Sequence, residues 1–259
     1  MIVIDQVSKR FGGIVAVDQC SFRIEAGTIT GLIGPNGAGK TTLFNIIAGF
    51  MPPTRGRILP DHRDVTGLPP HRLFHLGLVR TFQIPHEFAR MTTLENLMVV
   101  PPGQEGENLA NAWFRPARVA AREREVRRRA EEVLEFLSLE RLSDELAGNL
   151  SGGQKKLLEL GRALMSGCRI ALLDEPGAGV NRTLLARLVD SIRTLNRDHG
   201  YTFCIVEHDM DLVARLCDPV IVMAEGRVLT QGRFEEVRRN REVLDAYLGG
   251  MGGLAEGRA

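Results

Sequence analysis

Residues 34–42 read GPNGAGKTT, a glycine-rich loop that ends in Lys-Thr. The stretch fits the pattern G-x-x-x-x-G-K-[ST], in which backbone N–H groups turn inward around phosphate oxygens and the lysine reaches the β- and γ-phosphates. The loop follows the apolar run TITGLI (28–33) and precedes a helical pattern over residues 40–48, which Gly49 ends. The stretch therefore predicts a strand, a phosphate-binding loop and a helix in succession, and hence a nucleotide site.

Every residue of this loop is a candidate nucleotide contact. Lys40 supplies a cation to the β- and γ-phosphates, and Thr41 places a hydroxyl where Mg²⁺ takes an oxygen ligand. A surface Lys-Thr pair at a helix start is the alternative, and the surrounding glycines disfavour it. The predicted binding residues are Gly34, Pro35, Asn36, Gly37, Ala38, Gly39, Lys40, Thr41 and Thr42.

A second anion site is predicted far downstream, where LSGGQ spans residues 150–154. Ser151 suits a helix N-cap and two glycines follow it, so the first N–H groups of the helix and its dipole favour a bound anion. Ser151, Gly153 and Gln154 are therefore candidate nucleotide contacts as well. One chain thus contains two phosphate-binding surfaces.

Two carboxylates follow an apolar run in RIALLDEP (169–176). Asp174 ends this predicted buried strand, where an unpaired carboxylate is costly, so we expect it to hold Mg²⁺ through water. Glu175 comes next on the other side of the strand end, which suits a general base that orients the attacking water. The structural alternatives are an N-cap for Asp174 and a salt bridge for Glu175.

The order of these motifs resembles that of the nucleotide-binding subunits of ATP-binding-cassette (ABC) proteins, over roughly residues 1–250. VRTFQ with Gln83, GAGVN (177–181) and VEHDM with His208 complete the resemblance as Q-loop, D-loop and H-switch. LSGGQ is then the signature, and RIALLDEP is Walker B with its glutamate. The resemblance implies an ATPase that uses ATP and Mg²⁺. It implies an α/β fold with a P-loop NTPase (RecA-like) core, an antiparallel β subdomain and an inserted helical subdomain.

The resemblance also assigns roles to single residues. Glu175 is the expected general base, His208 donates a hydrogen bond to the γ-phosphate, and Gln83 ligates Mg²⁺ and orients water. The predicted catalytic set is Lys40, Gln83, Glu175 and His208, and the predicted metal set is Thr41, Gln83 and Asp174. Phe11 stands where the family keeps an aromatic that stacks on adenine, with Val17 packing on the base. Core packing is the alternative for Phe11.

The signature motif is expected to serve a partner chain, because the helical subdomain holds it well away from its own phosphate loop. Two chains arranged head to tail, each giving Ser151 and Gly153 to the other's ATP, would complete two composite sites. The second ATPase subunit is either an identical chain or a paralogue. Asn181 departs from the family pattern, which usually has Asp at the last D-loop position.

Length and composition limit the classes of protein to which the chain can belong. The 259 residues suit one large α/β domain, and a net charge of +1 gives no sign of a nucleic-acid partner. The four cysteines show no C-x-x-C spacing and are expected to be small buried side chains. We expect no signal peptide, and no apolar run reaches the ~18 residues of a membrane span. Any membrane role is expected to be peripheral, at the cytoplasmic face and through partners.

Hydrophobic periodicity predicts the organisation of the chain. We expect an ABC ATPase domain over 1–250, with a core of 1–85 and 160–250 and a helical subdomain over 86–159. A flexible glycine-rich tail is expected over 251–259. Smaller expected elements are antiparallel strands at 2–7 and 16–25, a loop at 101–116, a hairpin at 219–232 and an amphipathic helix through Val243, Leu244, Tyr247 and Leu248.

Several stretches resemble the ATPase subunits of branched-chain amino acid importers, among them KRFGG (9–13), MTTLENL (91–97) and AYLGG (246–250). This resemblance implies two permease subunits and an external solute-binding protein as partners. Importers of urea or short amides share much of this sequence and stay an alternative. A soluble ABC ATPase of DNA repair or translation is the other alternative. The single cassette, short helical subdomain and neutral charge disfavour it.

Overall fold

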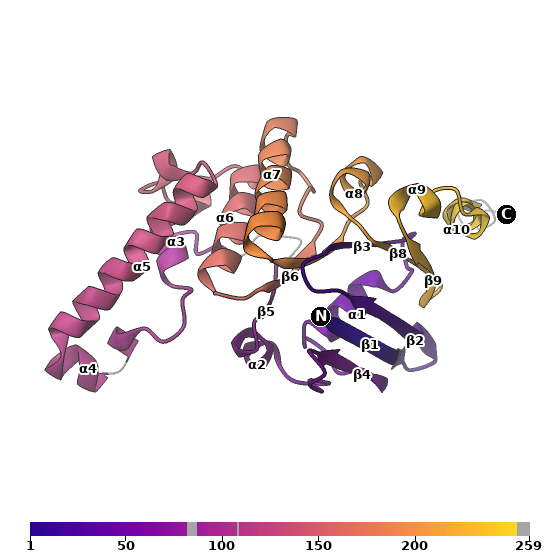
Figure 1. Cartoon of the computed structure of the whole chain (residues 1–259), viewed down its shortest axis with the longest axis horizontal. Coiled ribbons are helices and arrows are strands. Elements are labelled where there is room, and N and C mark those ends of the chain that lie inside the picture. Colours follow the sequence, from indigo (N-terminus) through magenta and orange to yellow (C-terminus); the bar gives the residue numbers. More distant parts are fainter. Residues whose placement is uncertain (82–86, 108, 253–259) are drawn as a thin grey trace. The chain divides into compact units, whose positions relative to one another are not determined.

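Strand β3 (Ile29–Ile33) leads into the Gly34–Thr42 loop and lies inside a six-stranded sheet (Figure 1). The strand order is β5-β6-β7-β3-β8-β9. The other strands are β5 (Leu78–Arg80), β6 (Ile170–Asp174), β7 (Thr202–Val206), β8 (Val220–Ala224) and β9 (Arg227–Gly232). All neighbours are parallel except β8 and β9, which form the predicted hairpin. The predicted α/β core with a parallel sheet is confirmed.

The register of this sheet aligns three strand ends. Val206 of β7 pairs with Asp174 of β6 on one side and with Leu32 of β3 on the other. Every residue of these three strands is buried, as expected for central parallel strands covered on both faces. The segments that leave their carboxyl ends therefore emerge side by side at one edge of the sheet.

A second sheet, of order β2-β1-β4, is antiparallel. Its strands are β1 (Ile2–Phe11), β2 (Ile14–Ile24) and β4 (Arg55–Pro60). Helix α1 (Lys40–Ile47) follows the phosphate loop and contributes Leu43 and Phe44 to one hydrophobic core shared with residues of both sheets. The loop is thus anchored by a helix whose apolar face is buried.

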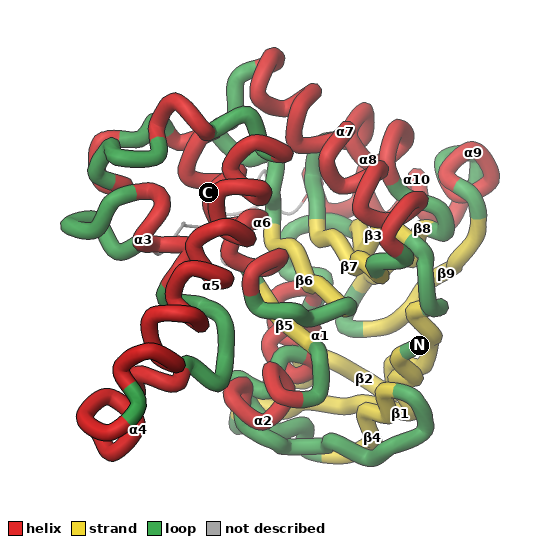
Figure 2. Tube along the Cα trace, turned by 60° about the vertical axis from the view of Figure 1, so that its left-hand side comes forward, coloured by secondary structure: helices red, strands yellow, loops and turns green. Residues whose placement is uncertain are grey.

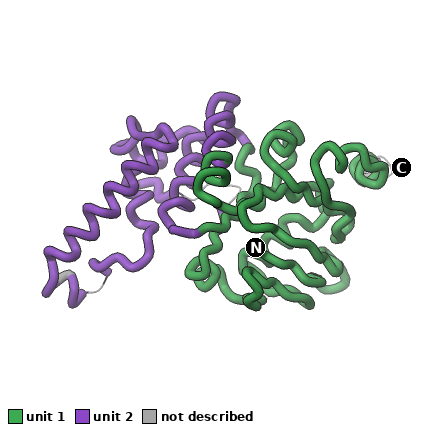
Figure 3. The backbone as a smooth tube through the Cα atoms, in the orientation of Figure 1, with its two compact units in different colours: residues 1–80, 169–177, 193–259 green, residues 81–168, 178–192 purple. Residues whose placement is uncertain are grey.

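The structure is a computed structural model that describes residues 1–81, 87–107 and 109–252. The chain divides into two compact units (Figure 3). One contains both sheets and comprises 1–80, 169–177 and 193–259; the other comprises 81–168 and 178–192. The second unit thus includes residues on both sides of the range 86–159 expected for the helical subdomain. Most of the predicted tail lies outside the described residues.

The second unit contains helices and loops, with no strand in the part of it that the structure describes (Figure 2). Its main helices are α3 (Thr93–Met98), α5 (Pro116–Phe136) and α6 (Gly152–Met165). Thr92 and Glu95 form a capping box that starts α3. On α5 the apolar side chains Val126, Ala130 and Leu134 are buried.

The prediction of a loop over 101–116 is wrong. This segment contains the 3₁₀ turn η1 (Glu105–Glu107) and the short helix α4 (Leu109–Phe114). Its three prolines and Gly103 lie near the ends of the segment, and Gly106 is accommodated inside the 3₁₀ turn. Two further 3₁₀ turns of this unit are η2 (Glu140–Leu142) and η3 (Ala147–Asn149).

The remaining helices complete the fold. They are α2 (Pro70–His75), α7 (Arg182–His199), α8 (Met210–Leu216), α9 (Phe234–Val237) and α10 (Arg241–Gly252). The predicted stripe on α10 is only partly correct, because Val243 is buried whereas Leu244 and Leu248 are exposed. All four cysteines are buried, as predicted. Within the described ranges, no helix combines the length and apolar character needed to cross a bilayer.

Gly161 of α6 marks close packing between helices of the helical unit. A Cβ there would lie 2.9 Å from Leu137 and 3.0 Å from Leu97, which belong to the chain after α5 and to α3. We expect Gly161→Val to cost about 1–3 kcal/mol through overpacking and to lower Tm. Ala121→Val, at an exposed position of α5, is the matched control. Equal Tm values for the two variants would contradict this packing.

Candidate nucleotide-binding site

The phosphate loop contains two positions at which only glycine fits the backbone conformation and the space available. Gly34 has φ +150°, and a Cβ there would lie 2.0 Å from the carbonyl oxygen of Met223. Gly39 has φ +93°, and its Cβ would lie 2.4 Å from the carbonyl oxygen of Ala16. Both positions combine a left-handed backbone with a close approach, so these glycines fix the curvature of the loop.

Lys40 lies folded into the loop that precedes it. Its Nζ donates to the carbonyl oxygens of Gly34 at 2.7 Å and Pro35 at 2.9 Å, and the residue is only 5% exposed. Burial lowers the pKa of Lys40, while the negative charge of Glu175 acts in the opposite direction. The loop thus holds a desolvated cation within electrostatic reach of Glu175, the residue that follows β6.

Glu175 follows β6 in a backbone conformation that is uncommon for a residue with a side chain. Its φ is +47°, and its N–H donates to the carbonyl oxygen of Val206 at 2.9 Å. Its Oε1 lies 3.0 Å from Nε2 of His208, the residue that follows β7 and Glu207. Residues in this left-handed region cost about 1–3 kcal/mol and cluster at functional sites. The turn directs the carboxylate toward the end of the neighbouring strand.

Glu207 joins the two segments that leave β6 and β7. Its Oε1 accepts from the N–H of Gly177 at 2.7 Å, and its Oε2 accepts from the N–H of His208 at 3.0 Å. The residue is 4% exposed, and burial raises the pKa of its carboxyl, with the backbone hydrogen bonds opposing that change. A buried carboxylate therefore fixes the backbone on which His208 stands.

Asp174 is held by an arginine on the adjacent strand. Arg80, the last residue of β5, donates from Nη2 to Asp174 Oδ2 at 2.7 Å, and both side chains are less than a tenth exposed. Arg80 Nη1 also donates to Asn45 of α1, and its guanidinium lies over the ring of Phe44. Arg80 thus connects the end of Walker B to the helix that follows the phosphate loop.

Of the two residues predicted to contact adenine, Phe11 fits the prediction better than Val17 does. Phe11 ends β1 and is 48% exposed, with Lys9 Nζ 5.3 Å from the centre of its ring. Val17 is completely buried, so its predicted packing on the base does not agree with the structure. Ile14 and Val15 on the same strand are exposed and can supply the apolar contact.

Ser151 and Gln154 form the N-terminal cap of α6. Gln154 accepts from the Ser151 N–H at 2.8 Å, and the Ser151 hydroxyl accepts from the Gln154 N–H at 3.4 Å. Ser151 and Gly152 are exposed, whereas Gly153 is buried against Val180 and Leu184. The predicted helix start is therefore present and exposed, with Gln154 as a capping residue, and its role as an anion site stays a prediction.

Asn181 has a local role that either Asn or Asp can fill. Its Oδ1 accepts from the N–H of Leu184 at 3.0 Å and so caps the start of α7. Asp or Asn can provide this oxygen equally. The predicted residue Gln83 lies outside the described residues.

The C-terminal helix reaches the phosphate loop as well. The hydroxyl of Tyr247 on α10 is buried, and burial raises its pKa, with the backbone of Gly34 partly offsetting the change. No pattern in the sequence indicated that the AYLGG end of the chain lies beside this loop.

Comparison with known families identifies the class of protein to which this fold belongs. A profile described as "ABC transporter" matches residues 17–178. The chain belongs to the ABC transporter family. A second profile, described as "Branched-chain amino acid ATP-binding cassette transporter", matches residues 227–252, which include α10 and Tyr247. The prediction that the chain is an ABC-type ATPase that binds ATP is confirmed.

Full-length relatives agree with these profiles. The chain is 42% identical, over 94% of its length and 93% of the relative, to a protein of Archaeoglobus fulgidus named "Probable branched-chain amino acid transport ATP-binding protein LivG". It is 38% identical, over 96% of its length and 98% of the relative, to the high-affinity branched-chain amino acid transport ATP-binding protein BraF of Pseudomonas aeruginosa. A crystal structure of an ABC transporter ATP-binding cassette in its ADP conformation superposes with a TM-score of 0.81, at 36% identity over 96% of this chain and 98% of the other.

Sequence reasoning missed Arg80 and Glu207. Glu207 ends an apolar run just as Asp174 does, and the same argument about a costly buried carboxylate would have selected it. Arg80 is a cation at the end of a short strand beside a buried sheet, which is a weaker signal. Its partner is 94 residues away in the chain, so only the strand pairing reveals it.

Arg80→Ala should destabilise the protein strongly, because it leaves Asp174 buried and without its cation. Breaking a buried pair from one side costs about 3–5 kcal/mol, whereas an exposed pair contributes about 0–1 kcal/mol. Arg57→Ala, which removes the exposed pair with Asp5, is the matched control. Urea unfolding of both variants checks this, and equal midpoints would show that Arg80 has no such role.

Proposed function

We propose that this chain is the ATP-hydrolysing, energy-coupling subunit of a membrane importer for branched-chain amino acids. One observation supports the ATPase part above all: Lys40, Glu175 and His208 meet at one edge of the parallel sheet, with a 3.0 Å contact between the last two. The substrate part is supported by the names of the full-length relatives and by the family of the profile at residues 227–252.

In this proposal the phosphates take the place of the carbonyl oxygens that now bind Lys40. The loop N–H groups and Lys40 neutralise the β- and γ-phosphate charge, and Glu175 polarises the attacking water. His208 contacts Glu175 through Nε2, and in this proposal it donates a hydrogen bond to the γ-phosphate once ATP is bound. Phe11 stacks on adenine, with its exposed strand neighbours in support.

The residues expected to hold Mg²⁺ are Thr41, Asp174 and Gln83, the last of them outside the described residues. Thr41 is exposed at the start of α1, and Arg80 orients the Asp174 carboxylate by binding one of its oxygens. These oxygen donors suit a hard cation that shares its coordination with phosphates, and Mg²⁺ supplies charge neutralisation there. In the described part of the chain no cluster of three or more acidic, His or Cys side chains suits a metal.

The working form is proposed to be a head-to-tail dimer with an identical or paralogous chain. The exposed N-terminus of α6 at Ser151 supports this, because a helix start that is open to solvent can accept the partner's γ-phosphate. Gly153 would contribute through its backbone, since its side-chain direction is blocked by Leu184.

Two permease subunits and an external solute-binding protein complete the proposed importer, with this chain at the cytoplasmic face of the membrane and no nucleic-acid partner. Residues 84–97 are the proposed permease contact, of which 84–86 lie outside the described residues. Phe88 is 47% exposed there, with Arg162 over its ring at 5.1 Å. Glu87 instead forms an ion pair with Lys155 at 2.7 Å. A substitution at Glu87 would break this pair as well as disturb docking, so Phe88 is the better position for a test of docking.

An importer of urea or short amides is the alternative, because no residue of this site contacts the transported solute. The chain is proposed to function as one ABC ATPase domain over 1–250. The helical subdomain is inserted in the sequence between the two segments that form the core.

Glu175→Gln tests the catalytic assignment. The amide keeps the shape but cannot act as a base, so hydrolysis should fall by about 10²–10⁴-fold while ATP still binds. ATP should then trap the chain as a dimer in size-exclusion runs, with the natural partner chain supplied if one exists. Glu235→Gln on the exposed helix α9 is the matched control and should leave turnover unchanged. Normal turnover in Glu175→Gln would remove Glu175 from the mechanism.

Uptake of labelled leucine, isoleucine and valine tests the substrate. Cells that lack this chain and any redundant importer should lose uptake, and the wild-type chain should restore it whereas Lys40→Ala should not. Unchanged uptake of all three amino acids would contradict the substrate while leaving the ATPase assignment in place, because the two rest on different residues.

A further inference from the structure

Glu207 uses its two carboxylate oxygens on two different segments of the chain. Oε1 accepts from the N–H of Gly177 at 2.7 Å, in the segment that follows β6. Oε2 accepts from the N–H of His208 at 3.0 Å and from that of Asp209 at 3.4 Å, in the segment that follows β7. The side chain is buried, and a carboxylate has the two acceptor oxygens that this arrangement requires, whereas an amide has one.

The two segments that Glu207 holds lead to different places. On one side, Nε2 of His208 lies 3.0 Å from Oε1 of Glu175. On the other side, Gly177 is the last residue of the sheet-containing unit before the chain enters the helical unit at Ala178 (Figure 3). The carboxylate therefore connects the residue expected to bind the γ-phosphate with the point at which the chain enters the helical unit.

Inside the helical unit, the chain that follows this point packs against the start of α6. A Cβ on Gly153 would lie 2.7 Å from Leu184 and 3.1 Å from Val180, so these side chains contact the first turn of α6 closely. Ser151 caps the same turn. A displacement of the segment 177–184 would therefore move the part of α6 that carries the signature residues.

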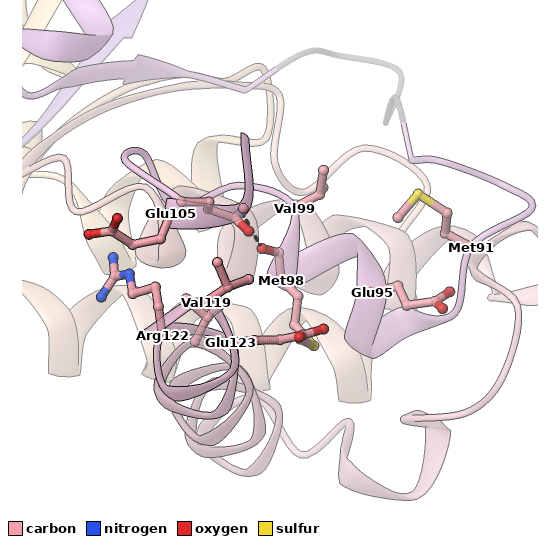
Figure 4. Close-up of a pocket in the computed structure, with 11 residues that line it drawn as sticks. Met91, Glu95, Met98, Val99, Glu105, Val119, Arg122 and Glu123 are labelled. Atoms are coloured by element: carbon pink, nitrogen blue, oxygen red, sulfur yellow. Dashed lines mark hydrogen bonds between the residues drawn. The ribbon is translucent and has the colours of Figure 1, made fainter. Parts of the chain in front are cut away.

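The helical unit has free space elsewhere. A cavity of about 340 Å³ opens between α3, η1 and α5, with Met98 and Val119 in its walls (Figure 4). Among the described residues, none from 177–184 and none from α6 lines it. The cavity thus does not loosen the contact of Val180 and Leu184 with α6, and close-packed parts of a protein transmit displacement because they are hard to compress.

We propose that Glu207 is a positioning residue for ATP hydrolysis that couples His208 to Gly177 and, through the segment 177–184, to the start of α6. Coupling between two positions is carried by hydrogen bonds and packed side chains, and the carboxylate, Gly177 and the packing on α6 form such a connection. A displacement of His208 on γ-phosphate binding would reach Ser151, which is expected to serve the partner's ATP. The proposal rests on the proposed function, since it takes His208 as the γ-phosphate contact.

Asp209 offers a matched control in the same turn. Its Oδ1 alone accepts from the N–H groups of Asp211 at 2.9 Å and Leu212 at 3.1 Å, so Asp209→Asn retains the acceptor that both bonds need. Glu207→Gln retains one of two acceptors and places an NH₂ group against a backbone N–H. Glu207→Asp keeps the negative charge but is one methylene shorter, so it cannot reach both segments, and it separates bridging from any effect of charge on Glu175.

Kinetics test the connection to His208. With whichever partner chain supports wild-type turnover, Glu207→Gln and Glu207→Asp should lower kcat at least about tenfold and leave the Kd for ATP within about twofold, whereas Asp209→Asn should match the wild type. In a His208→Ala background, Glu207→Gln should lower kcat further by less than about twofold, because it acts through His208. An equal factor in both backgrounds would show that Glu207 does not act through His208 and would overturn the proposal. The Tm of each variant verifies that it is folded.

Hydrogen exchange tests the connection to Gly177 without turnover. Amide exchange of peptides that cover residues 177–184 is measured in the same assembly, with and without a non-hydrolysable ATP analogue and Mg²⁺. The analogue should slow this exchange at least about threefold in the wild type and in Asp209→Asn. It should bind to Glu207→Gln and Glu207→Asp but leave the exchange unchanged, because the hydrogen bond that transmits its effect is lost.

No change in the wild type, or an equal change in all four proteins, would contradict the coupling to Gly177. Hydrolysis at the wild-type rate in His208→Ala would instead contradict the proposed function. The exchange measurement then still decides whether Glu207 connects the nucleotide site to the segment 177–184, so the two failures are distinguishable.

Discussion

The site depends on one constraint, the register that aligns the carboxyl ends of β3, β6 and β7. Parallel strands bring the segments that follow them to the same edge, and this edge is where ligands bind in open α/β sheets. Leu32, Val206 and Asp174 are aligned across the three strands. The phosphate loop, Glu175 and His208 therefore meet although they are far apart in the chain, and a slip of register in β6 would separate them.

Electrostatics then determine what this edge can do. Burial disfavours the charge of Lys40, and Glu175 opposes that effect, so a bound polyphosphate would supply the negative charge that the loop lacks. Around this centre two buried groups fix the geometry: Arg80 orients Asp174, and Glu207 holds the backbone of Gly177 and His208. The left-handed turn at Glu175 adds a strained position that these neighbours keep in place.

Local patterns predicted the loop, the strands and the helix starts, because each depends on residues within a few positions. The glycines within GPNGAGKTT permit the loop conformation, and the Ser and Gln of LSGGQ cap the helix that follows. The arrangement of Arg80 with Asp174 could not be predicted, since it depends on pairing between remote strands. The burial of Val17 was missed because alternation in β2 gives no fixed boundary between core and surface. Helix α4 was missed because prolines and glycines near its ends suggested a loop.

The central claim is that the residues at these three strand ends act together on bound ATP. Single-turnover release of γ-phosphate from ATP already bound to His208→Ala, assembled with whichever partner chain supports wild-type turnover, tests it most directly. The account predicts ATP affinity close to that of the wild type and a hydrolysis rate lower by about 100-fold or more, because the contact that orients Glu175 is lost. Hydrolysis at the wild-type rate would contradict it.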